Sequence, residues 1–251
     1  MMNDTELLKK RFSELAKKSY DGGYYTFSDF LGLPEQAAFR EVERDLAGKH
    51  DTFGGSDGTE RIMVRFGNPD ELGYETPFPI VCIKAEPLSQ KFADKLTHRD
   101  FLGALLNLGI ERSTLGDIVI IDNVGYIFAK EDIAEFITRE LSRVKRTDVS
   151  AEIIESLPEG ELFRTERRGI QISSERLDAV IAKVYALSRD DAATLIKRRL
   201  VFIDGKQAES VSYNLKVAEK ISVRGYGRFI YLGYETLSRK GRLNASVEVY
   251  V

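Results

Sequence analysis

Apolar residues in the last third of the chain recur at the spacing of a helix. Between positions 177 and 184 they follow one another at intervals of three and four, which places them on one face of a helix. Ser174 is the expected cap of this helix. A second helix is expected to begin at Ser188, because Asp191 three residues later completes a capping pattern. The pattern therefore predicts two consecutive short helices.

A β-hairpin is expected directly after these helices. Residues 200–203 are apolar, and Asp204-Gly205 is typical of a tight turn between antiparallel strands. Further strands are expected at 220–223, 228–232 and 245–251. Basic residues gather along the second helix and its exit: Arg189, Lys197, Arg198, Arg199 and Lys206. The stretch therefore predicts a cationic surface that could hold RNA.

The order of elements between residues 79 and 154 indicates a particular architecture. Strands are expected at 79–85, 117–121, 124–129 and 149–154, and helices at 99–108 and 131–141. Strand, helix, strand, strand, helix, strand is the order of a ferredoxin-like sandwich, the architecture of RNA-recognition motifs. Tyr126 and Phe128 would share one face of the third strand, where they would either stack on bases or pack under a helix.

The amino-terminal part has a mixed pattern. Amphipathic helices are expected at 4–19 and 35–46, and a strand at 59–66. Residues 156–160 (SLPEG) have the composition of a linker. We therefore predict an α+β multidomain protein with an amino-terminal α/β domain at 1–72, a ferredoxin-like, RNA-recognition-motif-like domain at 73–157 and a domain of two helices and a β-hairpin at 161–251.

Composition narrows the class of protein further. The chain has 251 residues, of which 43% are hydrophobic, so it can build substantial cores. We expect a cytoplasmic protein, because no apolar run is long enough to span a membrane and the first residues lack the apolar core of a signal peptide. The single cysteine, Cys82, lies in an apolar run and is expected to be a buried structural thiol. No disulfide framework and no metal site is expected.

Two glycine-rich stretches do not fit a nucleotide cofactor. Residues 54–58 (GGSDG) lead into a strand, and 225–227 (GYG) lie between strands. A phosphate-binding loop instead joins a strand to a helix whose amino terminus faces the phosphate. No cofactor is therefore expected.

The net charge of -3 conceals an uneven distribution. Residues 161–251 contain 17 lysines and arginines against 11 acidic residues, so this part is cationic, and residues 1–160 are correspondingly acidic. Binding to nucleic acid depends on the field at the contact surface and on the counterions released there. An acidic protein with a basic last third is therefore compatible with RNA binding.

Motifs in two parts of the chain resemble known families. Arg176-Leu177-Asp178, Ser188-Arg189, Leu195-Ile196-Lys197 and the stretches 201–205 and 221–228 resemble the RNA-binding domain named after small-subunit ribosomal protein S four. With residues 97–110 (THRDFLGALLNLGI), 115–118 (LGDI) and the GYET and GRL motifs near the end, the chain resembles the YlmH family of bacterial proteins. This family is linked with the large ribosomal subunit and peptidyl-tRNA in ribosome quality control, and with cell division.

The resemblance and the charge pattern together give a set of candidate RNA contacts. The expected contacts are Arg176, Ser188, Arg189, Lys197, Arg198, Arg199, Lys206, Arg224 and Arg228. A second contact is considered at His98, Arg99, Tyr126 and Phe128, with a structural role favoured for His98 and Arg99. Asp178 is expected to orient Arg176 or the second helix. Arg199 stands where the resembling domain commonly has glycine, so a left-handed backbone there would be strained.

The hypothesis is a non-enzymatic protein that binds structured rRNA or tRNA, with the large ribosomal subunit as partner. We expect a monomer without a membrane partner. The alternatives are an RNA-modifying enzyme of the pseudouridine synthase or methyltransferase type and an interaction protein of cell division. A catalytic aspartate in its own large domain or a cofactor loop would favour the enzyme, but neither context is found.

Overall fold

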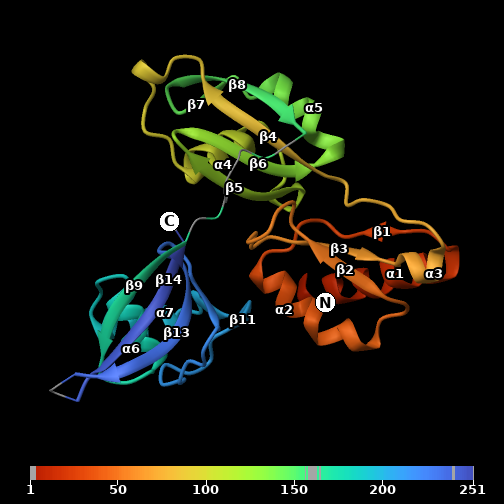
Figure 1. Ribbon diagram of the computed structural model, residues 1–251. Helices are drawn as coiled ribbons and strands as arrows, with labels where there is room; N and C mark the ends of the chain where they lie inside the picture. The colour runs from red at the N-terminus through yellow and green to blue at the C-terminus, as the bar shows by residue number, and fades with distance from the viewer. Residues whose placement is uncertain (1–3, 156, 158–162, 164, 239–240, 251) are drawn as a thin grey trace. The chain divides into compact units, whose positions relative to one another are not determined.

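The structure is a computed structural model that describes residues 4–155, 157, 163, 165–238 and 241–250. The chain divides into two compact units, residues 1–163 and 164–251 (Figure 1). Most of the predicted linker, 156–160, lies outside the described residues, and the three-domain division stays a prediction. None of the described helices is long and apolar enough to cross a membrane.

The first part of the first unit packs helices on a small antiparallel sheet. Its strands lie in the order β1-β3-β2, and Phe12, Phe39 and Phe66 fill the core between sheet and helices. The rings of Phe12 and Phe39 meet edge to face, with centroids 5.1 Å apart. The elements are α1 (Asp4–Gly22), β1 (Thr26–Phe27), α2 (Leu33–Val42), the 3-10 helix η1 (Glu43–Asp45), β2 (His50–Phe53), β3 (Met63–Phe66) and α3 (Pro69–Leu72).

The second part of this unit is a five-stranded antiparallel sheet in the order β5-β6-β4-β8-β7. Without the short β7, the strand order and the alternation of strands and helices are those of the predicted ferredoxin-like sandwich, which is confirmed. The elements are β4 (Ile80–Pro87), η2 (Gln90–Phe92), α4 (His98–Asn107), η3 (Arg112–Thr114), β5 (Leu115–Ile121), β6 (Val124–Lys130), α5 (Glu131–Glu140), β7 (Arg143–Val144) and β8 (Thr147–Ile154).

The two faces of this sheet are covered differently. Helices α4 and α5 cover one face, where Ile83, Ile127 and Ile137 are among the residues of the main core. Tyr126 and Phe128 point to the opposite face, because side chains alternate along a strand. The proposed packing under a helix is therefore wrong.

Tyr126 and Phe128 are nevertheless buried, at 8% and 1% exposure. They cluster with Cys82, and Leu157 and Phe163 pack against the cluster. The backbone at Gly55 passes so close to the Phe128 ring that a side chain there would collide with it. In this arrangement neither ring is open to a stacked base. The Cys82 thiol is buried as expected, and burial raises its pKa to about 12.

Arg61 fixes the small sheet against β5, and Arg112 holds the start of β5 by local hydrogen bonds. Arg61 donates from Nε to the carbonyl of Leu115 at 2.8 Å and from Nη2 to that of Phe30 at 2.9 Å. Arg112 also donates to the Leu115 carbonyl, at 2.7 Å. Burial, followed by repulsion from Arg61, lowers the pKa of Arg112 to about 10. Asp117 accepts the backbone N–H of Arg61 at 3.3 Å. These contacts hold the two sheets of the first unit together.

The second unit packs two helices on a six-stranded antiparallel sheet in the order β11-β10-β12-β13-β14-β9. The two helices, the β10–β11 hairpin and the strands β12, β13 and β14 lie where the sequence predicted them, whereas β9 was not predicted. Its core includes Leu177, Ile181, Ile196, Phe229 and Val247. The elements are β9 (Thr165–Ile172), α6 (Leu177–Val184), α7 (Arg189–Lys197), β10 (Val201–Ile203), β11 (Lys206–Gln207), β12 (Lys220–Val223), β13 (Gly227–Leu237) and β14 (Leu243–Tyr250).

The entry into α6 differs from the prediction. The residue before the helix is Arg176, and its side chain makes no capping bond, so the expected cap at Ser174 is wrong. The backbone of this segment is held by partners elsewhere in the unit instead. Arg176 forms an isolated β-bridge with Asn214, and the N–H of Leu177 donates to the carbonyl of Tyr213 at 2.7 Å.

Candidate nucleic-acid interface

A buried aspartate organises the starts of both helices in the second unit. Asp178 is 4% exposed and accepts hydrogen bonds from Arg176 Nε at 3.1 Å and from Arg189 Nη2 at 2.7 Å. Burial by itself would raise the pKa of Asp178, but these hydrogen bonds outweigh it and hold the pKa below its ordinary value. One carboxylate thus orients two guanidinium groups, which confirms the role expected of Asp178.

The amino terminus of α7 is capped as the sequence predicted. The Ser188 hydroxyl accepts the backbone N–H of Asp191 at 3.0 Å and donates to its carboxylate at 2.6 Å. The hydroxyl is therefore engaged in the helix cap. A contact from Ser188 to RNA would require the hydroxyl to form an additional hydrogen bond or to break those to Asp191.

The carboxyl terminus of α7 ends in a left-handed turn at Arg199. Its φ is 60°. The Arg199 N–H donates to the carbonyl of Ile196 at 2.9 Å, and the Leu200 N–H donates to that of Leu195 at 3.0 Å. This pair of bonds is a Schellman motif, whose left-handed position is usually glycine. The turn expected from the family resemblance is therefore present, and Arg199 adopts the strained conformation.

Backbone and side-chain contacts bring the β10–β11 hairpin to this end of the helix. Asp204 and Gly205 both have positive φ, 47° and 72°, as a two-residue hairpin turn requires. Gln207 donates from Nε2 to the carbonyl of Arg199 at 3.1 Å. Arg224 donates its N–H to the Leu200 carbonyl at 2.9 Å. The structure thus gathers Arg199, Lys206 and Arg224 around one end of α7. Lys206 is brought there by its neighbour Gln207.

Aromatic rings stand beside two of the predicted contacts. The Arg224 guanidinium lies 5.3 Å from the centre of the Phe202 ring, and that of Arg228 lies 4.4 Å from the centre of the Tyr250 ring. Tyr226, in the turn between β12 and β13, is 46% exposed. The sequence interpretation missed Tyr226 as a stacking candidate, although its position between Arg224 and Arg228 was visible in the sequence.

Several of these cations have no acidic partner. Among the described residues, no carboxylate lies within ion-pair distance of Lys197, Arg198, Arg199, Lys206 or Arg224. Their side chains are also exposed. Unpaired guanidinium and ammonium groups gathered in one place are the chemistry that phosphate oxygens require. We call the following set the cationic surface: the unpaired Lys197, Arg198, Arg199, Lys206 and Arg224, together with Arg176 and Arg189, which pair with Asp178, and Arg228 beside Tyr250.

The second predicted group of contacts belongs to the first unit and is not part of this surface. His98 and Arg99 lie in the first turn of α4, which Thr97 and Asp100 cap reciprocally. Tyr126 and Phe128 are buried as described above. No group of three or more potential metal-ligating side chains occurs in the described ranges.

Comparison with known proteins shows which domains this chain resembles. A family model described as "Putative RNA-binding domain in YlmH" matches residues 77–157, which contain the five-stranded sheet. The S4 domain model matches residues 175–221, which contain α6, α7 and the hairpin. The chain is 29% identical to the "Ribosome-associated protein quality control protein P2" of Bacillus subtilis over 232 residues, 88% of this chain and 86% of that protein. The resemblance to the YlmH family is confirmed.

A solved structure of a YlmH protein is also similar. The "Cell division protein ylmH from Streptococcus pneumoniae" has a TM-score of 0.48 and 21% identity, and the match covers 61% of this chain and 93% of that one. The domains matched in the present chain are RNA-binding domains and are not those of enzyme families. RNA binding is thus the function that the domain content of this YlmH-like chain supports.

Proposed function

We propose that this protein binds structured rRNA or tRNA through the cationic surface and acts on the large ribosomal subunit carrying peptidyl-tRNA, in ribosome-associated quality control. The observation that carries the proposal is the group of unpaired cations around the end of α7. The name of the Bacillus subtilis relative supports the ribosomal setting. We expect the protein to act as a monomer and without catalysing a reaction on the RNA.

The arrangement favours recognition of backbone and shape over base sequence. Lysine and arginine side chains placed at a helix end and a hairpin contact phosphate oxygens, which fix position on the RNA but carry little sequence information. The tethering of Arg176 and Arg189 to Asp178 reduces the side-chain entropy that binding would otherwise cost. The surface is therefore suited to a folded RNA of fixed shape.

The test is the salt dependence of ribosome binding by a Lys197→Ala/Arg198→Ala variant. These two residues are exposed and unpaired, so their replacement leaves the Asp178 contacts intact. Co-sedimentation with large subunits should weaken, and the slope of log affinity against log salt should fall by about 0.9 for each phosphate that the variant no longer neutralises. A Lys183→Ala/Lys216→Ala variant, which removes two exposed lysines outside the cationic surface, is the matched control in the same unit. Unchanged binding and slope in the first variant would exclude the proposal.

A further inference from the structure

Phe92 and Leu88 are the most exposed large hydrophobic side chains in the described part of the chain, at 82% and 70%. Both lie on the segment that joins β4 to α4, residues 88–95. Lys91 places its Nζ 5.5 Å from the centre of the Phe92 ring, and Lys95 is also exposed. An accessible ring flanked by cations is the combination with which proteins hold unpaired nucleotides, because the ring stacks on a base while the cations hold phosphates.

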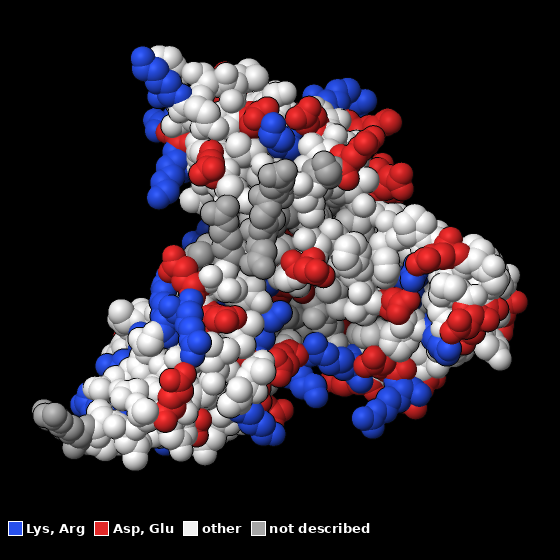
Figure 2. All heavy atoms as spheres, in the orientation of Figure 1, with Lys and Arg blue, Asp and Glu red and all other residues white. Residues whose placement is uncertain are grey.

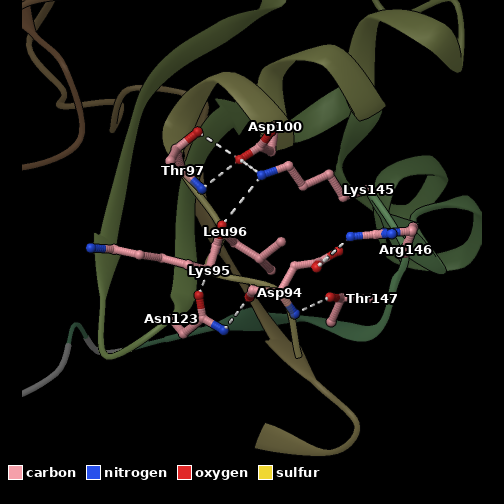
Figure 3. A network of polar contacts seen from close by, with 9 residues as sticks. All are labelled: Asp94, Lys95, Leu96, Thr97, Asp100, Asn123, Lys145, Arg146 and Thr147. Atoms are coloured by element: carbon pink, nitrogen blue, oxygen red, sulfur yellow. Dashed lines mark hydrogen bonds and ion pairs between the residues drawn. The ribbon is translucent and has the colours of Figure 1, made fainter. Parts of the chain in front are cut away.

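The segment is held firmly from two sides, although most of its side chains are exposed. On one side, the Asp94 N–H donates to Thr147 Oγ1 at 2.9 Å, and Arg146 pairs with the Asp94 carboxylate at 3.3 Å. On the other side, Asn123 donates from Nδ2 to the Asp94 carbonyl at 2.9 Å and accepts the Leu96 N–H at 2.7 Å. Figure 3 shows these contacts converging on the extended backbone.

The ends of the segment are anchored as well. The Leu88 N–H donates to the carbonyl of Asp148 at 3.0 Å, and Gln90 donates to that of Asp122 at 3.3 Å. Lys145 reaches the Lys95 carbonyl at 3.4 Å while pairing with Asp100 at 3.2 Å. The Lys95 side chain points away from this network (Figure 3). A ligand would therefore meet side chains on an ordered backbone, so binding would cost little backbone entropy.

Charge and shape around the segment are compatible with RNA. Figure 2 shows lysines and arginines at the end of the five-stranded sheet where the yellow segment that follows β4 lies in Figure 1. No carboxylate of the described residues lies within ion-pair distance of Lys91 or Lys95. An open hollow of about 460 Å³ follows Phe92 along the segment; residues 93–96, Ile120, Asp122 and Asn123 line it, and Lys95 is the cation among them.

We propose that residues 88–95 form a second RNA-contacting surface, in which Phe92 stacks on an unpaired base and Lys91 and Lys95 hold the neighbouring phosphates. The sheet face that RNA-recognition motifs use is covered here, since Phe128 is 1% exposed. The segment lies at the end of the sheet and remains open. This inference rests on the proposed RNA-binding function, but it does not depend on the cationic surface.

The test compares variants of the full chain in binding to a short fluorescein-labelled oligouridylate. Phe92→Ala should weaken binding by about fivefold or more, because stacking of one base on an aromatic ring contributes at least that factor. Lys91→Ala/Lys95→Ala should lower the salt slope by about 0.7 for each phosphate contact. Both changes are made in the unaltered chain and in the Lys197→Ala/Arg198→Ala variant. In that variant the cationic surface is weakened, so residues 88–95 should contribute a larger share of the remaining RNA affinity.

The matched control is Phe136→Ala, because Phe136 is also a partly exposed ring beside a cation, with Arg139 5.7 Å from its centre. It should leave RNA affinity unchanged. Crosslinking of a 4-thiouridine oligonucleotide to the unaltered chain should yield adducts within 88–95. Unchanged affinity of Phe92→Ala and no adducts in this segment would overturn the inference, whether or not the segment binds a protein. If Lys197→Ala/Arg198→Ala also kept full binding to ribosomes, the proposed function itself would fail.

Discussion

Replacing Arg199 by glycine should make the second unit more stable. Arg199 has a φ of 60°, and a left-handed conformation costs a residue with a side chain about 1–2 kcal/mol. Glycine avoids this cost but adds about 0.4–1 kcal/mol of unfolded-state entropy. The two hydrogen bonds of the turn come from backbone groups and survive the change. We therefore expect the free energy of unfolding to rise by about 0.5–1 kcal/mol, measured by urea denaturation.

The control for this change is Arg198→Gly. Arg198 has the same chemistry, but its φ is -78°, so glycine relieves no strain there and should lower the free energy of unfolding by up to about 1 kcal/mol. If Arg199 also contacts a phosphate, Arg199→Gly should weaken ribosome binding while it stabilises the fold, and the salt slope should fall by about 0.9. Equal destabilisation by both changes would refute the argument from strain. Stabilisation with unchanged binding would refute the phosphate contact alone.

Three further predictions concern buried side chains. Asp178→Asn should lower the free energy of unfolding by about 1–3 kcal/mol at pH 7. Because folding lowers the pKa of this aspartate, the difference in free energy between variant and unaltered chain should vanish as pH falls through and below 3.8. A difference that stays constant with pH in urea titrations would contradict this. The Cys82 thiol, with its pKa raised to about 12, should react with a disulfide reagent at pH 8 only as fast as the protein opens, and rapid reaction of the folded protein would be inconsistent with its burial. Phe128→Ala should lower the free energy of unfolding by about 3–5 kcal/mol yet leave RNA affinity unchanged in the folded fraction, whereas weaker binding by well-folded protein would show that this ring reaches RNA.

Local patterns in the sequence predicted the structure correctly where that structure depends on contacts between residues close in sequence. The capping pattern at Ser188 predicted the start of α7 because serine and Asp191 satisfy each other within one turn. The departure from glycine at Arg199 left open whether the turn there is left-handed and strained, and the structure shows a left-handed backbone. The order of elements between 79 and 154 predicted the ferredoxin-like sandwich because each strand there has an apolar face to bury.

The sequence did not predict the structure where it depends on contacts between residues far apart in the chain. Strands β2 and β9 lie at the edges of their sheets and are mostly exposed, so they lack the apolar alternation that would reveal them. Tyr126 and Phe128 were expected to share a face, and they do, but nothing near them in the sequence shows that Gly55 and Phe163 cover that face. Phe92 stood out in the structure only through its exposure.

The pairing of β9 with β14 also sets the order in which the second unit can form during synthesis. Tyr250 pairs with Thr165 and Leu243 with Ile172, so among the described strands the first of this unit finds its neighbour in the last. Val247, on β14, belongs to the same core as Leu177 of α6 and Ile196 of α7. The helices that carry the cationic surface are therefore synthesised long before the core that fixes them is complete. Because such distant contacts form slowly, we expect a growing chain to acquire RNA affinity late and in a single step.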